Sequence, residues 1–226
     1  MGQYYTLCNL DKRQCLSISL SLWGTMFFSG QKHLEQLANL GFKPFLALAL
    51  VDMAKVANNP NALWGSWSGD RVVLLGDYSD DIPEFLTDDE KLELKTKSIT
   101  LPALVQNEFE DLMKDPAKWF MNNEMLDGLF KDPQHVIVNL DQLEYLDPDQ
   151  FGDESSVDKF CLEKDGVMKG LYSTLFYSTG KGGGDIEHLK IGRWAGDRLS
   201  IVEMDTLPEF YRDVSGPVET LLRIIN

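Results

Sequence analysis

Short runs of β-prone residues open the chain and return further on. Residues 3–9 and 13–18 are separated by the polar pair Asp11-Lys12, and a third run follows at residues 71–78. Runs of this length, rich in aromatic and branched residues and bounded by polar turns, are typical of strands. The sequence therefore predicts two strands joined by a turn, and a third strand later in the chain.

Helical patterns lie between and after these runs. Residues 43–57 have a helical composition and end at polar residues and a proline. Thr87 and Glu90 fit a capping box, with Thr87 as the N-cap and Glu90 at N3, so a charged, exposed helix is expected there. Residues 103–130 carry apolar positions at helical spacing until Pro116 interrupts the helix.

The second half again mixes both patterns. Strands are predicted at residues 135–139, 142–146 and 198–204. Residues 167–178 fit either a helix or a buried strand, and Ser215 is placed to cap a last helix at 217–225 with Pro217 in its first turn. Helices and strands do not alternate in a βαβ rhythm, so the predicted fold class is α+β.

Two short motifs occur twice in the same order. Residues 9–11 read NLD and residues 67–71 read WSGDR. About 130 positions later, residues 139–141 read NLD and residues 194–198 read WAGDR. Strand-like runs precede NLD and follow WxGDR in both places. The sequence therefore predicts a degenerate tandem duplication.

The boundaries of the two copies follow from these motifs. The first copy is expected at residues 1–131 and the second at 132–226, and EFEDL at 108–112 has a weaker echo in EFYRDV at 209–214. A short turn, not a Pro/Gly/Ser-rich linker, joins the copies. We therefore expect them to pack as one compact, pseudo-symmetric body.

The charge narrows the choice of partners. The chain has 36 acidic and 21 basic residues and a formal net charge of −15. Such a surface repels nucleic-acid phosphate and anionic membranes, so we expect neither as a partner. It suits a basic protein, although the same charge also promotes solubility alone.

The cysteine content and the lack of a recognisable leader or membrane span lead us to expect a cytoplasmic protein. The three cysteines are too few and too widely spaced for a disulfide framework. The sequence has no basic leader and no apolar run of membrane-spanning length. Gly2 and Thr6 match the short myristoylation template, but residues 4–8 also fit a strand.

The WxGDR motifs supply the candidate binding residues. Adjacent Asp and Arg side chains on a strand point to opposite faces, so each must find another partner. One interpretation is structural: Asp caps the turn and Arg pairs with a carboxylate of NLD or of the other copy. The other is an anion-binding cleft between the copies. The candidate ligand-binding residues are Trp67, Asp70, Arg71, Trp194, Asp197 and Arg198, together with Lys12 and Arg13.

The remaining motifs carry weaker signals. Asp147 to Asp158 matches a calcium loop at only three positions, and the glycine-rich residues 180–185 lack the Walker pattern. His33, His135 and His188 have no metal-ligand spacing with a cysteine. We therefore expect no catalytic residue, metal or cofactor.

The motifs also carry a resemblance. The opening Met1-Gly2-Gln3-Tyr4-Tyr5, the NLDKR of residues 9–13, Gly76-Asp77-Tyr78 and WAGDR resemble a family of small fungal and bacterial proteins. The second copy departs from the pattern, because Gln142 and Leu143 replace the Lys-Arg pair and the GDY is lost. The resemblance supplies no catalytic residue and implies that these motifs define a fold.

Three functions are consistent with these features. The first is an acidic, non-catalytic binding protein of inhibitor or immunity type. The second is a small-molecule binder or hydrolase with an anion-recognising cleft between the copies. The third is a structural or storage role. The first two differ in whether Arg71 and Arg198 converge on an open pocket or lie in salt bridges.

Overall fold

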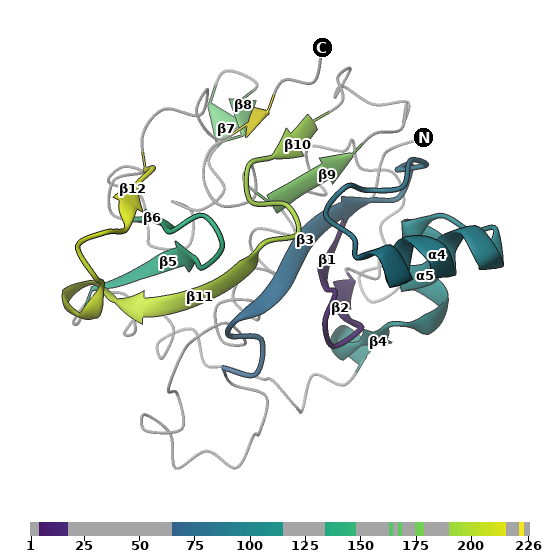
Figure 1. Ribbon diagram of the computed structural model, residues 1–226, viewed down its shortest axis with the longest axis horizontal. Helices are drawn as coiled ribbons and strands as arrows, with labels where there is room; N and C mark the ends of the chain where they lie inside the picture. The colour runs from purple at the N-terminus through teal and green to yellow at the C-terminus, as the bar shows by residue number, and fades with distance from the viewer. Residues whose placement is uncertain are drawn as a thin grey trace.

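The fold is α+β. The computed structural model describes residues 5–17, 65–114, 134–147, 163–164, 167–168, 175–178, 190–215 and 222–223. In these ranges a mixed β-sheet is accompanied by two α-helices, which lie together beside one end of the sheet (Figure 1).

The described strands are mostly short. They are β1 (Tyr5–Asn9), β2 (Gln14–Ser17), β3 (Asp70–Gly76), β4 (Glu110–Asp111), β5 (His135–Asn139), β6 (Glu144–Leu146), β7 (Glu163–Lys164), β8 (Val167–Met168), β9 (Phe176–Ser178), β10 (Lys190–Gly192), β11 (Arg198–Glu203), β12 (Arg212–Asp213) and β13 (Leu222–Arg223). The helices are α4 (Asp88–Lys97) and α5 (Leu101–Glu108), with 3-10 turns η3 (Leu112–Lys114) and η7 (Met204–Thr206).

The main path of the sheet runs β12-β6-β5-β11-β3-β1-β2-β4. At its centre β3 and β11 pair antiparallel, with Arg71 opposite Arg198. On each side an antiparallel hairpin follows, β1–β2 or β5–β6, and a short parallel strand closes the path, β4 or β12. The order of pairings outward from the centre is therefore the same on both sides.

Three further strands branch from β3. Strand β9 pairs parallel with β3, and β10 pairs antiparallel with both β9 and β13. Strands β7 and β8 form a separate two-stranded sheet. Residues 167–178, predicted as a helix or a buried strand, thus contain the strands β8 and β9.

Both α-helices begin at a capping threonine. Thr87 and Glu90 form the predicted capping box, and Thr100 accepts a hydrogen bond from the Ala103 amide at the start of α5. Because α4 and α5 are short, packing stabilises them more than propensity does. Their buried leucines, Leu94, Leu101 and Leu104, join one core cluster with Cys8, Cys15, Val73, Leu75 and Tyr177.

One predicted helix is confirmed only in its first part, and another is contradicted. The run predicted from residue 103 ends at Glu108, because Phe109 is extended and residues 110–111 pair with β2 as β4. The last predicted helix, 217–225, instead contains the strand β13, and the Ser215 hydroxyl accepts a hydrogen bond from the Asp147 amide. The predicted helix at 43–57 lies outside the described residues.

Candidate functional site

Each WxGDR motif forms a tight turn that leads into a central strand. Gly69 and Gly196 adopt φ angles of 84° and 81°, a region that L-residues other than glycine rarely occupy. The Gly69 amide donates to the Leu199 carbonyl at 2.8 Å, and the Gly196 amide donates to the Val72 carbonyl at 2.9 Å. The two turns are therefore bonded crosswise, each to the strand that follows the other.

The asparagine of NLD ties each hairpin turn to a WxGDR turn. Asn9 Nδ2 donates to Asp70 Oδ2 at 2.8 Å, while Asn9 Oδ1 accepts from the Lys12 amide at 2.9 Å. Asn139 makes the same pair of contacts, at the same distances, with Asp197 and the Gln142 amide. We call residues 9–14 with 67–71 the first frame, and residues 139–144 with 194–198 the second frame.

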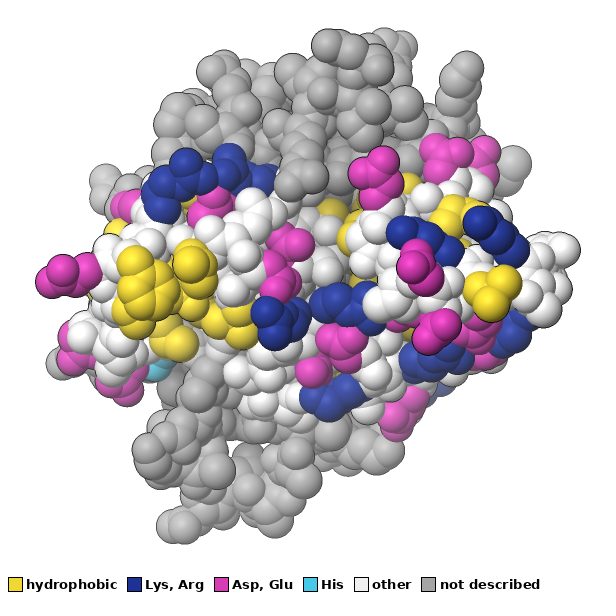
Figure 2. All heavy atoms as spheres, viewed as in Figure 1, with side chains coloured by type: hydrophobic (Ala, Val, Ile, Leu, Met, Phe, Trp, Pro, Cys, Tyr) yellow, Lys and Arg dark blue, Asp and Glu magenta, His cyan; other side chains and the backbone are white. Residues whose placement is uncertain are grey.

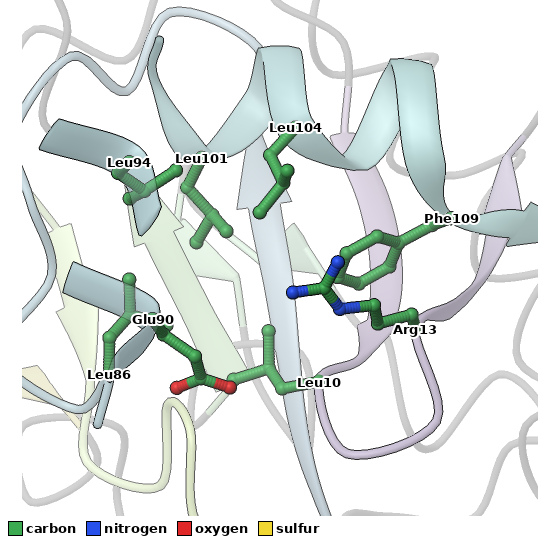
Figure 3. Close-up of a pocket in the computed structure, with 8 residues that line it drawn as sticks. All are labelled: Leu10, Arg13, Leu86, Glu90, Leu94, Leu101, Leu104 and Phe109. Atoms are coloured by element: carbon green, nitrogen blue, oxygen red, sulfur yellow. The ribbon is translucent and has the colours of Figure 1, made fainter. Parts of the chain in front are cut away.

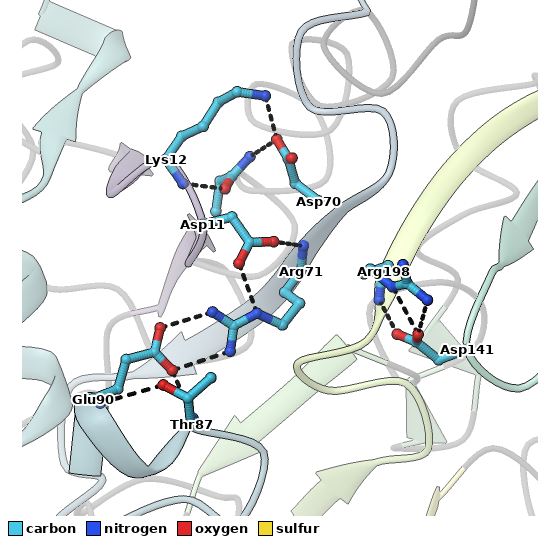
Figure 4. A network of polar contacts seen from close by, with 9 residues as sticks. Asp11, Lys12, Asp70, Arg71, Thr87, Glu90, Asp141 and Arg198 are labelled. Carbon is cyan, nitrogen blue, oxygen red and sulfur yellow. Dashed lines mark hydrogen bonds and ion pairs between the residues drawn. The ribbon is translucent and has the colours of Figure 1, made fainter. Parts of the chain in front are cut away.

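The aspartate of NLD binds the arginine of WxGDR within each frame. Asp11 accepts from the Arg71 amide at 2.8 Å and from Arg71 Nε at 2.7 Å. Asp141 accepts both bonds from Arg198 at 2.7 Å (Figure 4). The aspartate therefore fixes both the backbone and the side chain of the arginine. This matches the structural interpretation of the motif, in which the arginine pairs with a carboxylate of NLD.

Arg71 has a second carboxylate partner. Its Nη1 and Nη2 donate to the two oxygens of Glu90 at 3.0 and 2.7 Å. The side chain of Arg71 is 17% exposed, and the hydrogen bonds to Glu90, which burial only partly offsets, raise its pKa. Burial raises the pKa of Glu90, but hydrogen bonds from Arg71 and Thr87 outweigh it, so the net pKa is lowered.

The predicted site residues Lys12 and Arg13 contact different parts of the molecule. The Lys12 ammonium contacts Asp70 and the Ser66 carbonyl, inside the first frame. The Arg13 guanidinium contacts Glu93 on α4 and lies 3.3 Å from Glu108 on α5. Lys12 and Arg13 therefore do not converge on one site with Arg71.

The tryptophans of the two WxGDR motifs are interior residues. Trp67 and Trp194 have no exposed surface. Trp67 Nε1 donates to Gln14 Oε1, and Trp194 Nε1 donates to Glu144 Oε2, both at 2.9 Å. They anchor the frames from inside, in a position where a ligand would have to displace the core.

Glu144 is the most deeply buried carboxylate of the second frame. Its side chain is 2% exposed, and it accepts hydrogen bonds from Arg193, Arg212 and Trp194. Burial opposes its charge, but these donors outweigh the cost and lower the pKa of the carboxyl. The first frame has the neutral Gln14 at this place.

A small cavity lies between the first frame and the two helices (Figure 3). It holds about 10 Å³ and is lined mainly by leucines, together with Arg13 and Glu90. A space of this size accommodates about one water molecule. It is a packing gap of the helix–sheet interface and is too small for a metabolite.

The cysteines and metal candidates add no chemistry in the described ranges. Cys8 and Cys15 are free and buried, and burial raises the pKa of Cys15 to about 12 and that of Cys8 well above its usual value. Within the described ranges, His, Cys, Asp and Glu nowhere form a group of three able to hold a metal. Most of the calcium-loop candidate, the glycine-rich loop, His33 and His188 lie outside those ranges.

The residues that organise this region were only partly predicted. Asp11, Asp141, Glu90 and Glu144 bind the arginines and a tryptophan, yet the sequence singled out none of them as site residues. The repetition of NLD at a nearly constant offset was the available signal for the two aspartates. Nothing local marked Glu90 as a partner of Arg71.

No helix of the described residues has both the length and the apolar character required to cross a membrane. Comparison of the chain with protein-family models, with curated proteins and with solved structures finds no match.

Proposed function

We propose that the chain consists of two divergent copies of one unit, residues 1–131 and 132–226, packed as one pseudo-symmetric body that acts in the cytoplasm. The matching contacts of the two frames support the duplication, because each repeated residue type makes the same bond in both. The crosswise bonds of Gly69 and Gly196 support a single body. The free, buried thiols of Cys8 and Cys15 suit a reducing compartment.

We further propose that the protein is an acidic, non-catalytic binding protein of inhibitor or immunity type, with a basic protein as its partner. The observation that carries this proposal is the use of both WxGDR arginines in internal ion pairs. Each arginine is thereby bound by the aspartate of its own frame. The net charge of −15 then remains as the main feature available for recognition.

Affinity capture at two salt concentrations tests this function. The immobilised chain is exposed to a lysate of its source cells in low and in high salt, and retained proteins are purified and rebound. We expect a partner of net positive charge whose association rate falls steeply as ionic strength rises, because electrostatic steering is screened. An association rate independent of salt, or partners as acidic as the lysate average, would contradict the proposal.

A small anionic ligand is the second candidate function. Arg198 favours it, because its side chain is 53% exposed and Asp141 is the one carboxylate that it contacts among the described residues. Thermal shift with a panel of anionic metabolites, on the wild type and on Arg198→Ala, tests it. A compound that stabilises the wild type but not the variant would support this function, whereas stabilisation of neither would leave the protein-binding proposal in place.

A further inference from the structure

The two frames differ most in what covers them. In the first frame α4 and α5 lie over the hairpin turn, and Glu90 and Glu93 of α4 contact Arg71 and Arg13. Leu94, next to Glu93, is buried in the core beneath. One helix thus places a carboxylate on the WxGDR arginine, a second side chain on the hairpin turn three residues later, and an apolar anchor one residue after that.

The second frame has no such helix in the described chain. Residues 204–211 connect β11 directly to β12 through η7 and a turn, whereas residues 77–109 connect β3 to β4 and include both helices. Arg198 takes the place of Arg71, but its side chain is 53% exposed instead of 17%. Among the described residues, the guanidinium group contacts the carboxylate of Asp141 and no counterpart of Glu90.

Apolar residues replace the ion pair at the edge of this frame. Leu143 takes the place of Arg13, and both adopt positive φ angles, 54° and 51°. The Arg212 amide donates to the Leu143 carbonyl, as the Glu110 amide does to the Arg13 carbonyl, so Phe210 corresponds to Glu108. Leu143 and Phe210 are 43% and 66% exposed. An ion pair of the first frame has become an exposed apolar pair.

These side chains form a surface with no local reason to be apolar. Figure 2 shows hydrophobic side chains gathered over the end of the sheet that holds β5, β6, β11 and β12. The Phe210 ring stacks on Tyr211, with 5.2 Å between centroids, which restrains it. Leucine gains nothing from a left-handed turn position, where asparagine or glycine is favoured. Exposed, restrained apolar groups next to a half-exposed arginine are typical of a docking surface.

We infer that the surface formed by Arg198, Leu143 and Phe210 docks an amphipathic helix of a partner protein, in the way that α4 covers the first frame. The spacing in α4 sets the pattern: a carboxylate for Arg198, an apolar residue three positions later for Leu143, and an apolar anchor one position after that. The connection that contains Phe210 also carries the exposed Asp205 and Glu209, so lysines that follow the carboxylate on the partner helix would complement their charge. This inference rests on the proposed function and specifies the partner's binding element.

A peptide copied from α4 tests the surface. It consists of residues 86–99 with Glu93→Leu, so that it carries the capping box, a carboxylate at position 90 and apolar side chains at 93 and 94. Positions 92 and 96, which are exposed in α4, are joined by a staple, because an isolated helix of this length is marginal in water. Binding is followed by amide chemical shifts of the labelled full-length protein. We expect shifts at residues 141–143, 198, 207 and 209–212.

Two matched variants give the specificity of that binding. Leu143→Arg with Phe210→Glu restores the first-frame residues at exposed positions, and should weaken peptide binding about tenfold or more. A Glu90→Gln peptide should also bind more weakly to the wild type. Absence of shifts, shifts confined to the first frame, or equal binding by the double variant would overturn the inference. So would a wild-type dimer that Leu143→Arg with Phe210→Glu dissociates, because a second copy would then cover the surface.

The same double variant separates this inference from the proposed function. If a basic partner is retained equally by the wild type and the double variant, the binding function holds and this surface is wrong. If the peptide binds as expected but no salt-dependent partner is found, the surface holds and the proposed function is wrong.

Discussion

The two glycines of the WxGDR turns offer a controlled test of the packing between the frames and the helices. Gly69 and Gly196 have nearly equal φ angles and make equivalent backbone hydrogen bonds. Their surroundings differ. Among the described residues, a Cβ added at Gly69 would meet only Leu140 Cδ1, at 4.0 Å, whereas at Gly196 it would lie 2.3 Å from Phe85 Cγ and 2.6 Å from Phe85 Cβ.

The expected losses of stability follow from this difference. Alanine in the left-handed region costs ~1–2 kcal/mol, and Gly69→Ala should show this cost alone. Gly196→Ala adds a clash that Phe85 cannot relieve freely, because its ring packs edge-on against Tyr177 and borders the core. Overpacking of this kind costs ~1–3 kcal/mol. The free energy of unfolding should therefore fall by about 2–5 kcal/mol in Gly196→Ala.

Urea denaturation, followed by tryptophan fluorescence, measures both variants against the wild type. Phe85→Ala completes a double-mutant cycle, in which removal of the ring should recover part of the extra cost of Gly196→Ala. Equal losses for Gly69→Ala and Gly196→Ala, within about 0.5 kcal/mol, would refute the close packing of Phe85 on the second turn.

Two further predictions concern ionisable groups next to the first frame. Glu90→Gln should lower stability at neutral pH by ~1–2 kcal/mol through its pair with Arg71. Because the pKa of Glu90 is lowered, this contribution is fully present above its ordinary pKa of 4.5 and is lost only as the pH falls through the lower, folded value. The variant and the wild type should therefore converge in urea titrations only well below pH 4.5, and a constant difference would contradict this. In Cys161→Ser, the buried thiols of Cys8 and Cys15 should react with a disulfide reagent only after unfolding, since burial raises the pKa of both; rapid reaction in native buffer would show that they are accessible.

The frame strands were predictable because their patterns are local. Alternating or continuous apolar runs next to polar turns placed β1, β2, β3, β5 and β11 within a few residues. The capping box at Thr87 was equally clear, since its two partners are three residues apart. The wrong helix beyond Glu108 had helical spacing, but pairing with β2 is a tertiary contact that periodicity does not contain.

The contacts of the candidate site were predictable only as alternatives. Two repeated motifs indicated that Arg71 and Arg198 needed partners, and a carboxylate of NLD was one possibility. The choice depends on a hairpin turn and a strand sixty residues apart in sequence meeting in space, as Asp11 and Arg71 do. The second partner, Glu90, depends on where α4 packs, and no motif encodes that position.

The divergence between the frames separates structural from functional positions. Gln14 and Glu110 share a hydrogen bond across β2–β4, while Glu144 and Arg212 share an ion pair across β6–β12. The residue types at both positions differ between the frames while a contact is present in each, as expected where the contact stabilises the fold. Leu143 follows the opposite course, because the ion pair that Arg13 makes in the first frame was replaced by exposure. A position that loses its internal partner and becomes apolar, while its neighbours keep theirs, is where we expect selection for an external partner.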